Sequence, residues 1–312
     1  MKKKLITITT AVYNEELMVR EVYEVIKRTL APFAARYNYE HIFMDNCSTD
    51  GTLAILKQIA AKDKRVKIIT YSKNFGPVKT ELMGYEYSSG DAVITFDANL
   101  KDPEDLIPTF IQKWEEGYEV VYGVRPQTQD NPLMFFMRRL FYRITAWLAD
   151  EALPENVGGF RLLDRKVVAE LLKIDDFKPY VRGLIVSIGY KQVGIVYARR
   201  ARKRGVSKSH LSYLIDYAIN AFISYSIMPI RICTYAGVSL AVLSFLLAVA
   251  YIVVKLFFWK FQAPGIASVV VLVCFFSGIQ LFFLGIIGEY VGAIHSQVRK
   301  KPFVVVREKI NL

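Results

Sequence analysis

Cysteine is scarce in this chain, and the few that occur lie far apart. The 312 residues include three cysteines, Cys47, Cys233 and Cys274, and two of these fall within long apolar runs. This pattern argues against a disulfide framework and against a cysteine-based metal cluster, and it fits a reducing compartment. No apolar stretch of signal-peptide length follows the basic residues 2–4, so no secretory signal is expected. Internal repeats and low-complexity segments are absent as well.

Charge is absent from two long runs near the C-terminus. Ile232–Val254 carries none, and Ile266–Gly288 has only Gln280 as a strongly polar side chain. Roughly 20 residues at a rise of 1.5 Å each cross the ~30 Å hydrocarbon core of a bilayer, so each run is long enough. The alternative is a pair of buried core helices, but such helices rarely lack charge on every face over this length. The runs therefore predict two transmembrane helices within residues 231–291.

Acidic residues are outnumbered, 29 against 41 basic residues, which gives a net charge of +12. Basic residues gather before the apolar region, in Arg199–Lys208, and after it, in Arg299–Lys309, whereas the connector Phe258–Gly265 holds only Lys260. By the positive-inside rule this asymmetry places both termini and the soluble part in the cytoplasm, at the inner membrane. An anionic membrane surface, or a phosphorylated lipid within it, is therefore a better partner for this charge than nucleic acid.

The first 230 residues alternate short apolar or β-branched runs with helical stretches. Two of the helical stretches, Glu15–Leu30 and Thr52–Ile59, place apolar residues at helical spacing. Strands that alternate with helices are typical of a mostly parallel sheet, which predicts an α/β fold whose ligand crevice lies at the carboxyl ends of the strands. The predicted strands are Leu5–Thr9, His41–Met44, Val66–Thr70, Ala92–Phe96 and Val120–Tyr122.

The pattern changes from Leu211 to Ile227, where apolar residues recur at intervals of three and four. This spacing predicts an amphipathic helix, which we place in the headgroup layer of the membrane as residues 209–230. Ordinary packing of the same helix against the soluble domain is the alternative. The remaining boundaries are a soluble domain at 1–208 and a basic cytoplasmic tail at 292–312.

Polar residues follow four of the predicted strands. They are Thr10–Glu15, Asp45–Gly51, Ser72–Gly76 and Asp97–Leu100. Each cluster alone could be a turn followed by a helix N-cap, because Asn, Asp and Ser are favoured there. Four such clusters at one edge of a sheet, with Lys79 as a nearby cation, suit a nucleotide whose phosphates are bridged by a divalent metal ion.

Several short segments of distinctive composition follow one another along nearly the whole chain. They are Val12-Tyr13-Asn14-Glu15-Glu16, Asp45-Asn46-Cys47-Ser48-Thr49-Asp50-Gly51-Thr52, Asn74-Phe75-Gly76, Gly90-Asp91-Ala92, Asp97-Ala98-Asn99, Gly159-Phe160-Arg161-Leu162, Arg182-Gly183-Leu184, Arg202–Lys208, and Gly288-Glu289-Tyr290 followed by Lys301-Pro302. In content and order these segments resemble family 2 glycosyltransferases of the GT-A fold. Within that family the chain is similar to the bacterial polyprenyl-phosphate glycosyltransferases, relatives of dolichyl-phosphate mannose synthase.

The resemblance implies an inverting enzyme, expected to form a homo-oligomer, that moves a hexose from a nucleotide sugar to polyprenyl phosphate. The donor is expected to be a UDP-sugar, the acceptor undecaprenyl phosphate, and the cofactor Mg²⁺ or Mn²⁺. The implied catalytic residues are Asp97 and Arg161, and Asp97 with Asn99 would hold the metal. The implied nucleotide-sugar contacts are Ala11, Tyr13, Asn14, Glu15, Asp45, Ser48, Lys79, Asp97 and Ala98, and the implied lipid-phosphate contacts are Arg182, Arg200 and Arg202. Each arginine taken singly could equally be a solvated surface residue.

Three positions depart from the family pattern. Ala11 stands where proline is usual, Asn99 where the metal motif has a second aspartate, and Gly159 where an aspartate has been proposed as a base. An amide oxygen is a weaker, uncharged metal ligand. A lipid phosphate has its second pKa near 6 and is already mostly a dianionic nucleophile at pH 7, so a missing base matters less.

Two other functions are weighed against this enzyme. A catalytically weakened homologue, or a non-catalytic membrane scaffold with the same fold, stays open as the alternative. A processive polysaccharide synthase is disfavoured, because such enzymes usually have more spans and no Gln-x-x-Arg-Trp motif occurs here. Nothing in the motifs separates glucose from galactose, mannose or an N-acetylated sugar.

Overall fold

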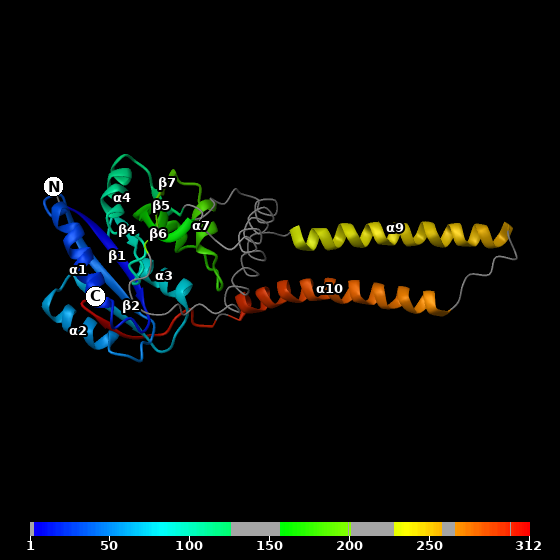
Figure 1. Cartoon of the computed structure of the whole chain (residues 1–312), viewed down its shortest axis with the longest axis horizontal. Helices are drawn as coiled ribbons and strands as arrows, with labels where there is room; N and C mark the ends of the chain where they lie inside the picture. Colours follow the sequence, from blue (N-terminus) through cyan, green and yellow to red (C-terminus); the bar gives the residue numbers. More distant parts are fainter. Residues whose placement is uncertain (1–2, 126–156, 199, 201–227, 258–265, 300) are drawn as a thin grey trace.

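The computed structural model has two parts, an α/β domain built around one sheet and two long helices that extend from it (Figure 1). The structure describes residues 3–125, 157–198, 200, 228–257, 266–299 and 301–312. The predicted amphipathic helix at 209–230 lies almost entirely outside the described residues. This helix and its place in the headgroup layer therefore remain a prediction.

The sheet has eight strands in the order β7-β5-β6-β4-β1-β2-β3-β8. Strands β4, β1, β2 and β3 are parallel neighbours at its centre, and β6 runs antiparallel between β4 and β5. At the two edges, β7 pairs in parallel with β5, and β8 pairs antiparallel with β3. The bounds are Lys4–Val12 (β1), Tyr37–Asp45 (β2), Val66–Tyr71 (β3), Ala92–Thr95 (β4), Val120–Val124 (β5), Val157–Asp164 (β6), Gln192–Val196 (β7) and Val306–Ile310 (β8).

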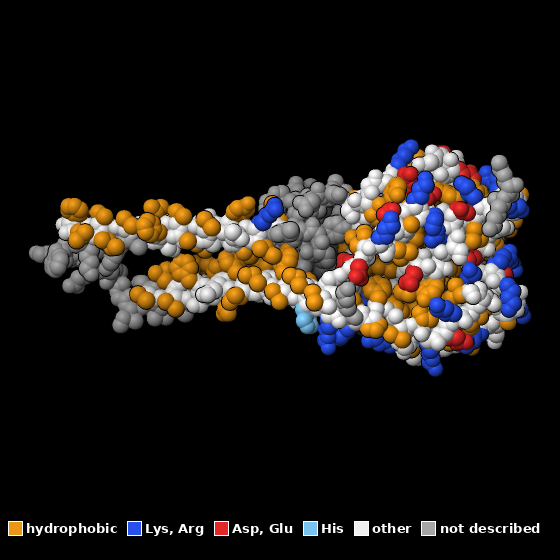
Figure 2. Space-filling model, turned by 180° about the vertical axis from the view of Figure 1, so that it is seen from behind, with side chains coloured by type: hydrophobic (Ala, Val, Ile, Leu, Met, Phe, Trp, Pro, Cys, Tyr) orange, Lys and Arg blue, Asp and Glu red, His pale blue; other side chains and the backbone are white. Residues whose placement is uncertain are grey.

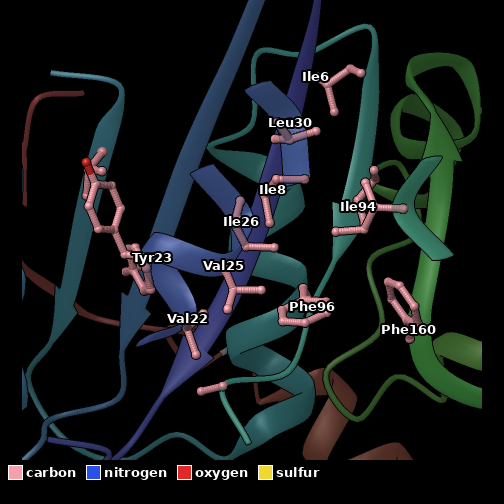
Figure 3. Close-up of a cluster of buried hydrophobic side chains, with 14 of the residues drawn as sticks. Ile6, Ile8, Val22, Tyr23, Val25, Ile26, Leu30, Ile94, Phe96 and Phe160 are labelled. Atoms are coloured by element: carbon pink, nitrogen blue, oxygen red, sulfur yellow. The ribbon is translucent and has the colours of Figure 1, made fainter. Parts of the chain in front are cut away.

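Helices cover both faces of this sheet. The core on one face is filled by side chains of α1 (Val19–Leu30), α2 (Thr52–Lys62) and α4 (Leu106–Glu115), and Figure 3 shows part of it, where Val22 and Ile26 of α1 lie near Ile8 of β1. A short 3-10 helix, Ala31–Phe33, follows α1. The other face is covered by α3 (Pro77–Glu86), α6 (Arg165–Leu171) and α7 (Val181–Ser187). Helix α3 lies close to the sheet because of Gly84, where a Cβ would stand 2.8 Å from the terminal methyl group of Met44.

All five predicted strands are present, and the mostly parallel α/β sheet confirms the predicted fold class. Strands β6 and β7 were not predicted. Strand β8 lies within residues 292–312, which the sequence analysis assigned to a basic tail. That assignment is wrong for Val306–Ile310, because this segment is the edge strand of the sheet and its Glu308 pairs with Lys57 of α2 at 2.7 Å.

The two predicted spans correspond to two long helices, α9 (Met228–Phe257) and α10 (Ile266–Val298). Within them, Ile230–Leu247 and Phe275–Val298 are long and apolar enough to cross a membrane, and neither stretch is buried inside the protein. Figure 2 shows hydrophobic side chains along both helices. Their exposure excludes the alternative of buried core helices. Helix α10 continues beyond the predicted boundary at residue 291 and reaches the α/β domain (Figure 1).

A buried histidine makes the stability of the domain sensitive to acid. His41 of β2 is 1% exposed, its Nε2 lies 3.0 Å from the hydroxyl of Thr10, and its ring packs against Phe43. Burial lowers the pKa of His41 from 6.5 to about 3. Between these two values the unfolded chain binds a proton that the folded chain does not, so stability is lost as the pH falls from 6.5 toward 3.

We expect this group to cost about 1.4 kcal/mol of folding free energy per pH unit over most of that window. His41→Gln removes the titrating group and can keep the contact with Thr10. Melting temperatures of the detergent-solubilised protein between pH 7 and 4 should therefore fall more steeply for the parent than for the variant. Parallel curves would contradict a depressed pKa at His41.

Candidate active site

The loops that follow β1, β2 and β4 meet at one edge of the sheet. These strands are parallel neighbours, so their carboxyl ends lie together. Two backbone hydrogen bonds fasten the loops to β1: Asn46 N–H donates to the carbonyl of Val12, and Phe96 N–H donates to that of Thr9, both at 2.9 Å. This edge brings together the predicted nucleotide-sugar and metal residues that follow the three strands.

The loops after β1 and β2 are joined through Asn14, which has a positive φ of 53°. Its N–H donates to the hydroxyl of Ser48 at 2.9 Å, and its side-chain oxygen accepts the N–H of Thr49 at 2.7 Å. Next to it, Glu15 N–H donates to the hydroxyl of Thr52 at 2.8 Å. Asn14 and Ser48, both predicted to contact the nucleotide, therefore also hold the two loops together.

Asp45 ends β2 at this edge of the sheet and is 1% exposed. Burial raises the pKa of its carboxyl, while hydrogen bonds from Ser48, whose N–H lies 3.2 Å away, act in the opposite direction. Ala11 and Tyr13, at the end of β1, are half-buried. A buried carboxylate with remaining acceptor capacity suits the N–H groups of a nucleobase.

The predicted metal residues lie in the loop after β4. The side-chain nitrogen of Asn99 is 3.5 Å from Oδ2 of Asp97, and its oxygen accepts the N–H of Lys101 at 3.0 Å. The amide oxygen that was expected to bind a metal thus closes a turn in this structure. Ala98, between them, is 5% exposed and packs in the core.

A buried cluster beside Asp97 was not predicted. The carboxylate of Asp102, 1% exposed, accepts a hydrogen bond from Tyr197 and is paired with Arg125 at 3.3 Å. Arg125 also donates to the Tyr197 hydroxyl at 3.0 Å. Burial tends to lower the pKa of Arg125, but the charge of Asp102, the contact with Tyr197 and, more weakly, the charge of Asp97 together outweigh it and raise that pKa. A fixed guanidinium therefore lies within electrostatic range of Asp97. The position of Asp102 directly after the metal motif was the signal available in the sequence.

Comparison with known proteins identifies the family to which this arrangement belongs. Residues 7–172 match the family described as Glycosyl transferase family 2. This range includes every loop described above except the one that carries Tyr197. The chain belongs to this family. It is a glycosyltransferase, and the GT-A fold predicted from its motifs is confirmed by the family and by the mostly parallel sheet.

Relatives of this glycosyltransferase match it over almost its full length. It is 35% identical to the uncharacterized glycosyltransferase YkcC of Bacillus subtilis, covering 98% of this chain and 94% of the relative. It is 30% identical to the SfII prophage-derived bactoprenol glucosyl transferase of Shigella flexneri, covering 97% of each. Among solved structures, glucosyl-3-phosphoglycerate synthase from Mycobacterium tuberculosis is 19% identical with a TM-score of 0.49, covering 70% of this chain and 76% of that one.

Arg161 of the glycosyltransferase lies on β6, opposite Thr95 of β4. It is 3% exposed, its guanidinium is paired with Glu81 of α3 at 3.1 Å, and its Nε lies 3.3 Å from the carbonyl of Gly159. Glu81 accepts the hydroxyl of Tyr85, which lies 2.9 Å from the hydroxyl of Thr95 at the end of β4. The predicted catalytic arginine is therefore a buried member of a polar network that reaches the end of β4.

Of the remaining predicted cations, Lys79 and Arg182 lie on helices α3 and α7, whereas Arg200 contacts the loop after the metal motif, where its N–H donates to the carbonyl of Lys101 at 2.8 Å. Lys79 of α3 stands over the rings of Phe177 and Phe303. Arg182 lies in α7 and is half-buried. Arg200 is paired with Glu104 at 2.6 Å and Asp105 at 2.7 Å, just after the metal motif, whereas Arg202 lies outside the described residues.

Proposed function

We propose that this glycosyltransferase moves one hexose from a nucleotide sugar, expected to be a UDP-sugar, to a polyprenyl phosphate, with inversion at C1. The observation that carries this proposal is the match to relatives named bactoprenol glucosyl transferase, which covers 97% of both chains. The match therefore includes the two candidate spans as well as the family 2 domain. Undecaprenyl phosphate is the acceptor that we expect.

The chemistry suits an acceptor that needs no general base. A phosphate monoester is mostly a dianion at pH 7, so its oxygen can attack the sugar C1 without losing a proton first. The required work is to hold two phosphate-bearing substrates together and to stabilise the leaving diphosphate. The half-buried Arg125, held by Asp102 and within electrostatic range of Asp97, offers a positive charge for that purpose, and Gly159 leaves open space at the position of the usual aspartate.

A divalent ion, Mg²⁺ or Mn²⁺, fits the residues at the end of β4. Within the described residues no three acidic, histidine or cysteine side chains gather to hold a metal ion. Mg²⁺ sites commonly use one or two carboxylates and complete their shell with substrate phosphates, and Asp97 supplies one such carboxylate, with Asn99 3.5 Å away. Bound there, the ion would neutralise charge on the leaving diphosphate.

The assay that tests this function uses the full-length protein in detergent or nanodiscs with undecaprenyl phosphate, a panel of labelled UDP-, GDP- and dTDP-sugars, and Mn²⁺ or Mg²⁺. We expect a lipid-linked monosaccharide from one donor, with inverted anomeric configuration, and none when the lipid is omitted. Nucleotide-sugar binding without any transfer would instead support the non-catalytic scaffold, which the engaged oxygen of Asn99 favours.

We further propose that both termini and the catalytic domain lie in the cytoplasm. The segments before and after the two spans each carry several basic residues, whereas the connector between the spans carries only Lys260. In intact cells, a cysteine introduced at Gln262 should react with an impermeant thiol reagent, and one at Asn311 should not. The background control is a variant that lacks the native cysteines. Labelling at Asn311 but not at Gln262 would reverse the orientation.

Arg200 and Arg202 are proposed to bind the phosphate of the lipid acceptor. Loss of a charge-assisted contact to a buried phosphate costs about 1.5–3 kcal/mol, or roughly one to two orders of magnitude in rate. Arg200→Ala or Arg202→Ala should therefore depress transfer to lipid by that amount, while nucleotide-sugar affinity stays within about twofold of the parent.

The pairing of Arg200 with Glu104 supplies the matched control. Glu104→Gln removes one of the two ion pairs of Arg200, the other being with the exposed Asp105, and keeps the guanidinium, so transfer should remain near the parental rate. If Glu104→Gln lowers transfer as much as Arg200→Ala does, Arg200 only fastens the loop after the metal motif. An equal loss of nucleotide-sugar affinity and transfer would move Arg200 to the donor diphosphate.

A further inference from the structure

Lys79 makes its closest described contacts with aromatic rings. Its amine stands 3.5 Å from the ring centroid of Phe177 and 4.7 Å from that of Phe303. The two rings themselves meet edge to face, with centroids 6.5 Å apart. Among the described residues no carboxylate forms a recorded salt bridge with Lys79, so the faces of these rings are its charge partners. Lys79 thus joins α3 to two segments that are distant in the sequence.

Both aromatic rings belong to segments that are tied to the end of α10. In the last turn of α10, the side-chain oxygen of Gln297 accepts the N–H of Phe177 at 2.8 Å, and its nitrogen donates to the carbonyl of Asp175. Phe303 follows α10 directly, in the segment that leads into β8. A contact at Lys79 is therefore a contact with the end of a candidate membrane span, as the approach of α10 to the domain near α3 in Figure 1 illustrates.

The opposite side of α3 contacts strands β6 and β4. Glu81 and Tyr85 are four residues apart and so share one face of the helix, which Lys79 does not. Glu81 is paired with Arg161 at 3.1 Å, and the Tyr85 hydroxyl lies 2.9 Å from that of Thr95. Thr95 ends β4 and stands two residues before Asp97. Helix α3 therefore lies between the end of α10 and the strand that carries the metal motif.

The charges around Lys79 favour an ammonium group that contacts the two aromatic rings over one that lacks this contact. Partial burial and, to a smaller degree, the positive charges of Lys73 and Lys178 lower the pKa of Lys79. Like charges nearby make the ammonium costly unless something attracts it, and the negative faces of aromatic rings do so. Lys73 is placed differently, since it stands over the ring of Phe75 at 5.2 Å.

We propose that Lys79 is a positioning residue that joins the end of α10 to α3, and through Glu81 and Tyr85 holds the strand that carries Asp97. Its role is thus to transmit the position of the membrane helix to the metal motif, rather than to bind the nucleotide as the sequence suggested. The use of a lipid acceptor as a readout rests on the proposed function.

The test compares full-length variants in nanodiscs. Lys79→Met removes the charge and keeps the length of the side chain, Lys79→Arg keeps the charge, and Phe303→Leu removes one ring. Lys73→Met is the control for loss of a neighbouring positive charge. We expect Lys79→Met and Phe303→Leu to lower kcat for lipid transfer about tenfold with KM and Kd for the nucleotide sugar within about twofold, and Lys79→Arg to restore kcat. Hydrogen exchange at 175–178 and at 92–99 should become faster in the two impaired variants.

Two outcomes would overturn the proposal. A rise in Kd for the nucleotide sugar in Lys79→Met that matches its loss of kcat would return Lys79 to the donor site. Unchanged kcat and unchanged exchange at 92–99 would reduce the contact to local packing. If the parent itself shows no transfer to lipid, the proposed function fails, whereas nucleotide affinity and hydrogen exchange still decide the role of Lys79.

Discussion

Asp97→Asn is expected to abolish metal-dependent binding of nucleotide sugar and to lower transfer about a hundredfold or more. Loss of even an indirect partner of a metal site commonly costs about 10–100-fold, and Asp97 is the charged ligand of the proposed site. Its neighbour cannot take its place, because Asn99 carries no charge and its oxygen already accepts the N–H of Lys101. The measurement is thermal stabilisation by UDP-sugars with and without Mn²⁺, together with the transfer rate. A variant that binds sugar nucleotide and metal like the parent would show that the site lies elsewhere.

Asn99→Asp is the matched gain-of-charge variant. Its carboxylate can keep the hydrogen bond from Lys101 and turn the second oxygen toward Asp97, where the amide nitrogen now lies 3.5 Å away. Two carboxylates at this distance repel each other in the absence of metal and attract a divalent ion together. We expect metal affinity to rise about tenfold, and thermal stability without metal to fall. Weaker metal binding by this variant would contradict the assignment of the site.

The central sheet and the loops of the site follow from local sequence patterns. The strands β1, β2, β3 and β4 are apolar runs bounded by polar residues, and the edge at which their loops meet follows from parallel pairing alone. The loops around Asn14, Asp45 and Asp97 were predicted for this reason. Strand β8 could not be predicted, because Val306–Ile310 places three consecutive charged residues between two apolar ones, as a solvated tail can, and only its pairing with β3 shows that it belongs to the sheet.

The cations of the site were the residues least determined by sequence. A lysine or arginine has a long side chain, and its partner is chosen by tertiary packing rather than by spacing. Arg161 was expected at the substrate, but its guanidinium reaches Glu81 on a different element. Arg125 was not expected, since its partners Asp102 and Tyr197 come from two loops separated by more than 90 residues. The abundance of cations therefore indicated the kind of ligand, phosphate, whereas the contact of each cation depends on the tertiary structure.

Arg161→Met is expected to destabilise the protein by about 3 kcal/mol, because it leaves the carboxylate of Glu81 without its buried partner. The value lies at the lower end of the range for buried ion pairs, since the side chain of Glu81 is 18% exposed. For a domain of this size the loss corresponds to a fall in melting temperature of roughly 6–12 °C. Transfer activity should fall with it, because Tyr85 and Thr95 link the same carboxylate to β4.

The double variant Arg161→Met with Glu81→Leu separates positioning from catalysis. Replacing both partners of a buried pair with apolar side chains of similar size is often neutral, so most of the lost melting temperature should return. If Arg161 acts only by holding α3 against β4, activity should return with stability, to within about tenfold of the parent. If stability returns and transfer stays as low as in Arg161→Met, the guanidinium itself serves the substrate. In that case the arginine must leave Glu81 during turnover, and the ion pair seen here is its resting position.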